Sequence, residues 1–287
     1  VIKLESLAAE LFGQESALFL PSGTQSNLAA LLTHCERGEE YIVGQEAHTY
    51  LYEGGGGACF GGIQPQPILQ NADGTLDLEI VKSVIKPDDY HFARTKLLCL
   101  ENTTWGKVLP FDYLSQARDL ARDNNLKIHL DGARIFNAAV SQKSSLSDIA
   151  SYFDSISACL SKGLGAPVGT VLIGNNEFIK EARRWRKVLG GGMRQSGFLA
   201  AAGIYALKNN INRLSEDHLN AELLSDGLSS IKEIDVKSVN TNMIFISLAE
   251  DRRDDLIDYL RNNKVLVIGI SPSMIRLVTI KTLIKMI

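Results

Sequence analysis

Cysteine is scarce in this chain of 287 residues, and neither sign of charge is in large excess. The cysteines stand apart without CxxC spacing, so neither a disulfide framework nor a zinc site is indicated. We therefore expect reduced thiols in a cytoplasmic protein without a metal site. The net charge of −3 gives no indication of a polyanionic partner. The apolar runs are strand-sized and are interrupted by charge or glycine, so we expect no membrane span.

What the sequence does contain is a series of short apolar runs separated by segments of helical length. Its 45% apolar and 22% charged residues are typical of a globular protein. The strand candidates are ALFLP (17–21), EYIVG (40–44), KLLCLEN (96–102), LKIHLDG (126–132), SISACLS (155–161) and TVLIG (170–174). Helical patterns fill segments 2–12, 23–35, 76–86, 111–124 and 175–188. This alternation predicts an α/β fold with a mainly parallel sheet between helices.

The pattern changes after a helical segment near 197–214. Strand-like runs and a charged helix follow, at 242–248, 251–263, 265–269 and 274–279. We therefore expect a large domain of residues 1–205 and a small C-terminal α+β domain of residues 206–287. Because the chain opens inside a helical pattern and closes without a stop signal, we also expect outer segments of both domains to be missing.

Polar residues follow four of the predicted strands at the point where each strand ends. They are Ser22-Gly23-Thr24, Glu101-Asn102, Asp131 and Lys162. The carboxyl ends of parallel strands meet at one edge of a sheet, where α/β proteins bind their ligands. We therefore expect these residues to converge on a single site.

The stretch PSGTQSN (21–27) turns from a strand into a helix. Gly23 permits close approach of the backbone, and Thr24 adds a hydroxyl beside the free N–H groups of the first helical turn, which suits a phosphate. An ordinary helix N-cap is the alternative interpretation, since Ser and Thr cap many helices. The lysine of a GxxxxGK[ST] loop is absent, so nucleotide hydrolysis is not indicated.

Lys162 stands at the end of a buried strand among small residues, in CLSKGLG (159–165). An amine in a partly desolvated pocket can form a Schiff base with a carbonyl, whereas a loop lysine that extends to water is the alternative. Asp131, in DGAR (131–134), can pair with a protonated ring nitrogen or simply cap the next helix. Pyridoxal 5'-phosphate needs an amine, an acid and a phosphate site, and His48 is available to stack on its ring.

Seven stretches spread through nearly the whole chain match the motifs of a known enzyme family. They are PSGTQSN, HCERGEEYIVGQEAH, HFARTKLLCLENT, HLDGARIFNA, CLSKGLGAPVG, RRWRKVLGGGMRQSG and IRLVT. In these stretches the chain resembles the threonine aldolases, most closely the bacterial low-specificity L-threonine aldolases. The resemblance implies a pyridoxal-phosphate-dependent transferase-like fold (aspartate aminotransferase fold type I) with a small α+β domain. It also implies retro-aldol cleavage of L-threonine, L-allo-threonine and related β-hydroxy-α-amino acids to glycine and an aldehyde.

The same resemblance implies how pyridoxal 5'-phosphate is held. Lys162 forms the Schiff base, Asp131 pairs with the pyridine nitrogen, and His48 stacks on the ring. Gly23 and Thr24 bind the phosphate. Further residues that the resemblance places at the cofactor are Arg134, Lys187 and Arg194.

The resemblance also implies how the amino-acid substrate is bound. Arg134 and Arg276 hold its carboxylate, which sets the Cα–Cβ bond perpendicular to the cofactor ring. His91, in HFART, lies near the substrate hydroxyl, so that His48, His91 or an ordered water removes the hydroxyl proton. Sites of this family commonly form between subunits, and a homodimer or homotetramer is therefore expected.

The match to the family departs at three points. The stretch ENTTWG carries Thr104 and Trp105 where the family has histidine, which predicts a change in aldehyde preference or hydroxyl handling. Ile280 follows IRLVT where the family has another histidine. An N-terminal Arg-Ser-Asp-Thr stretch of the family has no counterpart in this chain, and we expect weaker activity or lower stability without it.

Other functions stay open at this point. A β-eliminating lyase or a racemase-like enzyme would use the same scaffold and cofactor, and a non-catalytic cofactor-binding protein is a further alternative. The run ARRWRK (182–187) also invites nucleic-acid binding through arginines and an interleaved tryptophan. The acidic overall balance favours an exposed helix face or a subunit contact instead, so we expect no nucleic-acid partner.

Overall fold

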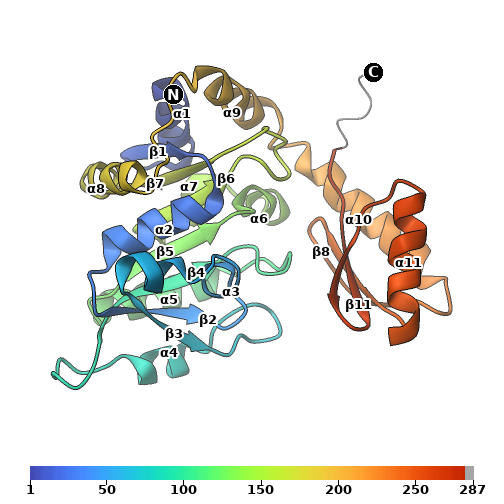
Figure 1. Ribbon diagram of the computed structural model, residues 1–287, viewed down its shortest axis with the longest axis horizontal. Helices are drawn as coiled ribbons and strands as arrows, with labels where there is room; N and C mark the ends of the chain where they lie inside the picture. The colour runs from blue at the N-terminus through green and yellow to red at the C-terminus, as the bar shows by residue number, and fades with distance from the viewer. Residues whose placement is uncertain (282–287) are drawn as a thin grey trace. The chain divides into compact units, whose positions relative to one another are not determined.

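The computed structural model describes residues 1–281, and these residues form two compact units (Figure 1). The first unit contains residues 1–104 and 108–211. The second begins at residue 212 and also takes in the short segment 105–107. Each unit is described separately below. None of the described helices is both long enough and apolar enough to cross a membrane.

The first unit is built on a seven-stranded sheet with the order β1-β7-β6-β5-β4-β2-β3. Its strands are β1 (Ser16–Leu20), β2 (Glu39–Gly44), β3 (Gln64–Ile68), β4 (Arg94–Glu101), β5 (Lys127–Gly132), β6 (Ser155–Cys159) and β7 (Thr170–Gly174). The strands from β3 to β6 pair in parallel, while β7 pairs antiparallel with both β6 and β1. The predicted mainly parallel sheet is therefore confirmed. Two prolines place β3 at the edge, since proline cannot donate to a sheet ladder.

Helices cover both faces of this sheet, with α2 in front of it and α5 behind it in Figure 1. The helices are α1 (Ile2–Phe12), α2 (Gly23–His34), α3 (His48–Leu51), α4 (Leu78–Val84), α5 (Phe111–Asp123), α6 (Ile135–Gln142), α7 (Leu146–Ala150), α8 (Asn176–Val188) and α9 (Gly197–Asn209). A short π-helix runs from Gly57 to Gly61. Because both faces are covered, every residue of β6 and β7 is buried, and so is every residue of β5 after Lys127.

Helix α2 brings the middle of the sheet into contact with the rest of the core. Leu28, Leu31 and Leu32 pack into one apolar cluster with side chains of β2 and β4. Ala29 and Ala30 pack with side chains of β1, β7 and α8 in a second cluster. Helix α2 therefore packs against both clusters, with its leucines in the first and its alanines in the second. The polar residues Ser26 and Asn27 of α2 hydrogen-bond to Ser157 and Asp131 of the sheet.

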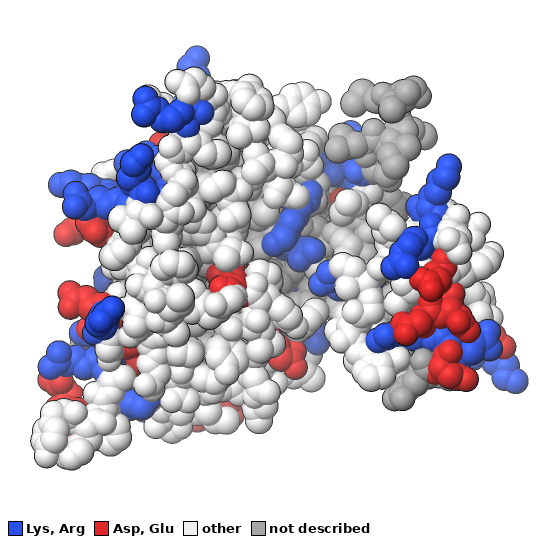
Figure 2. All heavy atoms as spheres, viewed as in Figure 1, with Lys and Arg blue, Asp and Glu red and all other residues white. Residues whose placement is uncertain are grey.

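The second unit is a four-stranded antiparallel sheet with the order β10-β11-β9-β8. Its elements are α10 (Leu214–Ser229), β8 (Asp235–Asn240), β9 (Met243–Ser247), α11 (Glu250–Asn262), β10 (Ile268–Ser271) and β11 (Met274–Val278). Ala221, Ile244, Ile246 and Ile275 form its core. Figure 2 shows the charged side chains of α11 gathered on the surface of this unit. The sequence pattern misses β8 because none of its side chains is fully buried and few are apolar.

The short segment 105–107 joins this second unit through specific contacts. The Trp105 ring meets the Phe245 ring edge to face, with centroids 5.9 Å apart. Thr241 Oγ1 donates a hydrogen bond to the carbonyl of Gly106 at 3.0 Å. Trp105, one of the positions where the chain departs from the family motif, is therefore held by packing on β9.

Candidate active site

The carboxyl ends of the parallel strands in the first unit gather the predicted polar residues at one edge of the sheet. Glu101 at the end of β4 is in register with Asp131 near the end of β5. Asp131 is in turn in register with Ser157 on β6, and Lys162 follows three residues after that strand. His48 begins α3 just after β2. Residues far apart in the sequence thus meet because their strands lie side by side.

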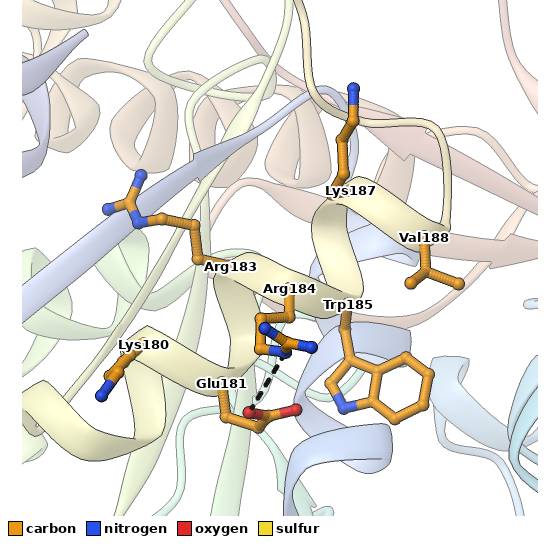
Figure 3. A pocket seen from close by; sticks show the side chains of 7 residues that line it. All are labelled: Lys180, Glu181, Arg183, Arg184, Trp185, Lys187 and Val188. Carbon is orange, nitrogen blue, oxygen red and sulfur yellow. Dashed lines mark ion pairs between the residues drawn. The ribbon is translucent and has the colours of Figure 1, made fainter.

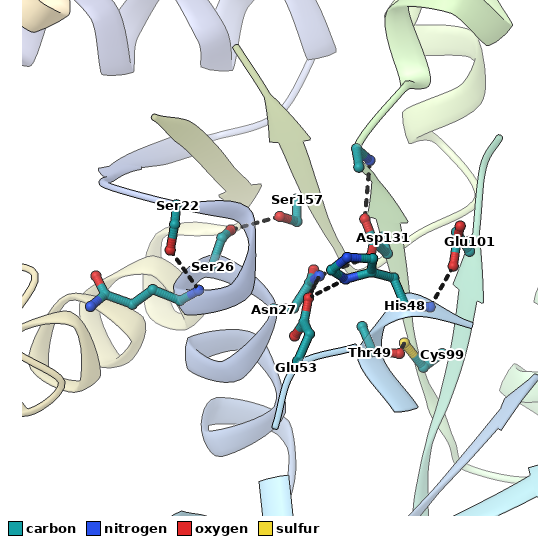
Figure 4. A network of polar contacts seen from close by, with 12 residues as sticks. Ser22, Ser26, Asn27, His48, Thr49, Glu53, Cys99, Glu101, Asp131 and Ser157 are labelled. Carbon is teal, nitrogen blue, oxygen red and sulfur yellow. Dashed lines mark hydrogen bonds and ion pairs between the residues drawn. The ribbon is translucent and has the colours of Figure 1, made fainter. Parts of the chain in front are cut away.

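Asp131 is a buried carboxylate, with only 2% of its surface exposed. One of its oxygens accepts a hydrogen bond from the backbone N–H of Ala133 at 3.1 Å, and the other accepts one from Asn27 Nδ2 at 2.9 Å (Figure 4). It forms no ion pair with any residue in the described part of the chain. A buried anion without a cation is costly, so this carboxylate fits a ligand that brings a positive charge.

His48 is held on two sides by carboxylates. Its backbone N–H donates to Glu101 Oε2 at 2.8 Å, and its Nδ1 lies 3.0 Å from Glu53 Oε1. The His48 side chain is 46% exposed, whereas that of Glu53 is 4% exposed. Ligand atoms of His48, Glu53 and Asp131 all lie within 4.8 Å of one another. The Nδ1 edge of the imidazole therefore faces the buried Glu53 carboxylate, and the rest of the ring is partly exposed.

These carboxylates perturb one another's protonation. Burial raises the pKa of Glu101 to about 8, and the negative charge of Asp131 adds to this rise. The hydrogen bond from His48 and the charges of His48 and Lys162 oppose it. Burial also raises the pKa of Glu53, while the hydrogen bond with Glu53 raises the pKa of His48. The edge of the sheet is thus a place where acids retain protons and the imidazole is more basic than usual.

Lys162 lies in a turn that leaves its amine available. The side chain is half-buried, and its Nζ makes no hydrogen bond or ion pair with the residues that the structure describes. The backbone N–H of Gly165 donates to the Lys162 carbonyl at 2.9 Å, and Gly165 has a φ of 74°. A positive φ suits glycine, and this tight turn explains the small residues after the lysine. An unpaired, partly desolvated amine is the form that a carbonyl can capture.

The start of α2 offers a cradle for an anion. Ser22 caps the helix by accepting a hydrogen bond from the N–H of Gln25 at 3.1 Å, which leaves the N–H groups of Gly23 and Thr24 free for a ligand. The hydroxyl of Thr170 is buried without a hydrogen-bond partner, and a Cβ added to Gly23 would lie 3.7 Å from it. An unused hydroxyl beside free N–H groups fits a phosphate.

A family model described as the beta-eliminating lyase family matches residues 1–251. Over 276 residues the chain is 59% identical to a protein named low specificity L-threonine aldolase from Escherichia coli K12, covering 96% of this chain and 82% of that protein. The chain belongs to the threonine aldolases of this family.

Other relatives of this threonine aldolase chain agree in fold. It is 40% identical to low-specificity L-threonine aldolase 1 of Arabidopsis thaliana, over 96% of this chain and 80% of that protein. A solved Leishmania major threonine aldolase is 26% identical and superposes with a TM-score of 0.83, over 97% and 83% of the two chains. A Burkholderia pseudomallei sphingosine-1-phosphate lyase structure, 18% identical over 97% and 71%, shares the fold with a TM-score of 0.74. The predicted fold-type I architecture is confirmed.

Three further predicted residues, Arg134, Lys187 and Arg194, belong to the first unit of the threonine aldolase chain. Arg134 is half-buried and follows Asp131 by three residues, where α6 begins. Lys187 lies at the end of α8, and the loop that follows packs on the first turn of α2 through a bond from Gln25 Nε2 to the Leu189 carbonyl at 3.0 Å. The exposed Arg194 lies between α8 and α9.

Among the described residues, no contact of the first unit places His91 or Arg276 at this edge of the sheet. His91 precedes the first residue of β4, and its Nδ1 bonds to Asp89 at 2.6 Å. Because β4 has eight residues, its two ends are about 23 Å apart, and His91 lies at the amino edge, opposite Glu101. The role of His91 therefore stays a prediction that rests on the resemblance. Arg276 lies on β11 in the second unit, where its Nε is buried and has no hydrogen-bond partner among the described residues.

Two residues of the site were not identified from the sequence. Asn27 donates both to Asp131 and to Glu53 Oε1, each at 2.9 Å. Asn27 stands inside the PSGTQSN motif, so its position one turn after Gly23 was an available signal. Glu53 precedes a glycine cluster, and the neighbouring sequence does not indicate that it is buried. Its burial depends on partners that come from α2 and α3.

A separate hollow of about 560 Å³ lies over α8 and is lined by the basic run (Figure 3). Its lining residues are Lys180, Glu181, Arg183, Arg184, Trp185, Lys187 and Val188. Arg184 makes an ion pair with Glu181 at 3.9 Å, and most of these side chains are exposed. This hollow contains neither Lys162 nor Asp131, so it is distinct from the site at the sheet edge.

Proposed function

We propose that this chain is a pyridoxal-phosphate-dependent threonine aldolase. In this proposal it cleaves L-threonine, L-allo-threonine and related β-hydroxy-α-amino acids to glycine and an aldehyde, which is acetaldehyde from threonine. The main support for the proposal is that two charged groups without a charged partner lie at one edge of the sheet. Within the described residues, the half-buried Lys162 amine has no partner and the buried Asp131 carboxylate has no cation.

The residues at the sheet edge suit each part of the cofactor. Lys162 would hold it covalently, Asp131 would face its ring nitrogen, and His48 would stack on the ring. The first turn of α2, with Gly23 and Thr24, would hold the phosphate. When bound, the cofactor supplies an electron sink for the charge released by carbon–carbon cleavage.

The chain's own groups then account for binding and proton transfer. Asp131 would accept a hydrogen bond from a protonated ring nitrogen, because a buried carboxylate is stabilised by a positive partner. Arg134, and by resemblance Arg276, would bind the substrate carboxylate and so orient the bond that breaks. Glu53 occupies Nδ1 of His48, so Nε2 is the atom that can take the hydroxyl proton, directly or through an ordered water.

The test is chemical trapping of the cofactor on the purified protein. We expect absorbance from bound pyridoxal phosphate and, after borohydride reduction, a modified peptide that contains Lys162. Lys162→Ala should lose threonine cleavage by several orders of magnitude, with Lys180→Ala, an exposed lysine on α8, as the matched control. A label on another lysine, or full activity of Lys162→Ala, would contradict the proposal.

The name of the matching family model favours β-elimination as a second candidate reaction. Product analysis separates the two reactions on the same protein. Glycine and acetaldehyde in equal amounts from L-threonine support retro-aldol cleavage. Pyruvate from serine or 2-oxobutanoate from threonine, each with ammonia, would support elimination instead.

We further infer self-association and a cytoplasmic location. Apolar side chains near His48 are exposed on the first unit, namely Leu51 on the same helix and Tyr52, whose ring lies beside the His48 ring. Their exposure supports a contact with a second copy at the margin of the site. The cysteines within the described residues are all free thiols, as is usual for a protein in a reducing compartment.

A further inference from the structure

A line of polar side chains, buried except for the half-buried His34, leads away from Asp131 between α2 and the strands β5 and β6. Asn27 Nδ2 lies 2.9 Å from Asp131, and Asn27 Oδ1 lies 3.3 Å from His129 Nε2. His129 Nδ1 lies 2.8 Å from the hydroxyl of Ser155, which lies 2.6 Å from His34 Nε2. The line thus joins the carboxylate of the site to a histidine at the far end of α2.

The periodicities of the elements make this line possible. Asn27 and His34 are seven residues apart on α2, which places them on one helix face about 10.5 Å apart along its axis. His129 and Asp131 are two residues apart on β5, so they point to the same face of the sheet. His129 and Ser155 are direct partners in the parallel pairing of β5 with β6.

The donor and the acceptor in each hydrogen bond of the line follow from the two bonds that Asn27 donates. Both N–H groups of Asn27 point to carboxylates, Asp131 and Glu53, so its Oδ1 must accept from His129 Nε2. The Nδ1 of a neutral His129 is then an acceptor, and the Ser155 hydroxyl donates to it. The Ser155 oxygen in turn accepts from His34 Nε2.

Both histidines are neutral under ordinary conditions, as this direction requires. Burial lowers the pKa of His34 to about 4, with the Asp154 charge opposing that effect. Burial likewise lowers the pKa of His129 to about 3, and His34 adds to the decrease. The His34 ring also stacks on the Phe178 ring with centroids 4.6 Å apart, which fixes its orientation.

We propose that His34, Ser155, His129 and Asn27 form a one-way hydrogen-bond chain that positions Asp131 for the ring nitrogen of the cofactor. Each donor polarises the next, so that Asn27 delivers a strengthened N–H to the carboxylate. The carboxylate is held in one orientation by Asn27 and by the Ala133 N–H, with its remaining lone pairs available to a cationic ring. This inference rests on the proposed function, and these four are positioning residues that act through Asp131.

The first test needs no cofactor, because it reads the tautomers of the histidines. The protein has five histidines, so ¹⁵N-histidine spectra can be assigned with single variants. We expect His129 and His34 to carry their protons on Nε2 at neutral pH. In Ser155→Ala the Nδ1 signal of His129 should shift as it loses its donor. A proton on Nδ1 of His129 in the parent protein would overturn the proposal.

The second test measures the dissociation constant of pyridoxal phosphate by absorbance and equilibrium dialysis. His129→Leu should weaken binding about 10-fold, and Ser155→Ala and His34→Leu about 3-fold, since each loses a buried hydrogen bond. His34→Gln keeps an N–H donor at the end of the chain and should stay within about 2-fold of the parent. Thr33→Val is the matched control, because among the described residues the Thr33 hydroxyl bonds to the Ala29 carbonyl alone.

The outcomes separate this inference from the function on which it rests. A parent protein that binds no cofactor would defeat the proposed function, whatever the histidine tautomers. A parent that binds it normally, with His129→Leu and Ser155→Ala unchanged in affinity and cofactor spectrum, would overturn the positioning chain alone. Equal losses in His34→Leu and His34→Gln would also count against it, because only the first removes the donor.

Discussion

At the scale of single residues, the site is governed by carboxylates that share a small buried space. Asp131 and Glu53 both accept from the one amide of Asn27, and Glu53 also bonds His48. Burial alone would favour a neutral His48, yet its bond to Glu53 raises its pKa. The imidazole is therefore protonated to a higher pH than a free histidine, and it becomes a base only above that range.

Replacement of Glu53 by glutamine should move the pH dependence of cleavage. Because Glu53 raises the pKa of His48, Glu53→Gln lowers it, and the deprotonated imidazole appears at lower pH. The acidic limb of the kcat/KM profile for L-threonine should shift in the acid direction. A titration of the His48 Cε1 proton provides an independent reading. An unmoved limb would show that His48 does not set it.

Glu101 should make the cofactor-free protein less stable as the pH rises. Its pKa is about 8 in the folded chain against an ordinary value of 4.5, so the folded state holds a proton that the unfolded state has lost. The free energy of unfolding should therefore fall between about pH 4.5 and about pH 8. Glu101→Gln should match the parent at pH 4 and exceed it at pH 9 in urea denaturation. Equal stabilities at both pH values would refute the assignment.

At the scale of elements, α2 performs several tasks along its length. Its first turn carries the proposed phosphate-binding N–H groups, Asn27 donates a hydrogen bond to Asp131, and its leucines pack in the core against β2 and β4. His34 in the last turn bonds to β6. A displacement of this one helix would therefore affect phosphate binding and the orientation of Asp131 together.

Removal of the cap of α2 should cost stability and weaken phosphate binding. Ser22→Ala leaves the N–H of Gln25 without its side-chain acceptor, which should lower the free energy of unfolding by about 1 kcal/mol. Ser22→Thr retains the acceptor and is the control. Chemical denaturation measures the stability change, and the affinity for inorganic phosphate reports on the cradle. Identical denaturation midpoints for Ala and parent would contradict the capping role.

At the scale of the whole molecule, two units with different sheets share one chain. Lys162, Asp131 and His48 belong to the first unit, and Arg276 lies on β11 of the second. The segment 105–107 leaves the strand that carries Glu101 and is counted with the second unit. The departure from the family motif at Trp105 thus falls where the chain passes between units.

The exposed apolar side chains beside the site should mediate self-association. We expect the purified protein to have a mass of at least twice 31.4 kDa by light scattering. Leu51→Glu places a charge on a side chain that is 49% exposed on α3, the helix that begins with His48, and should lower that mass. Tyr90→Glu changes a side chain that is 92% exposed at the opposite edge and should leave it unchanged. A monomeric parent would refute the inferred contact.

Much of the fold and part of the site could be predicted from local sequence patterns. Apolar runs alternating with helical periods indicated the parallel sheet, and polar residues at strand ends indicated Asp131 and Lys162. The same rule does not indicate His91, since a residue that precedes a strand lies at the amino edge. The predicted role of His91 therefore rests on the motif resemblance and not on strand polarity.

What the sequence determined by itself was therefore periodic and local: where strands and helices run, and which polar residues stand at their ends. Only the tertiary structure decided which side chains meet. Asn27 bonds to Asp131 across 104 positions of sequence, and His34 bonds to Ser155 across 121. Such contacts depend on the register between strands and on the rotation of α2 against them. No short segment contains that information, because it arises when the core packs.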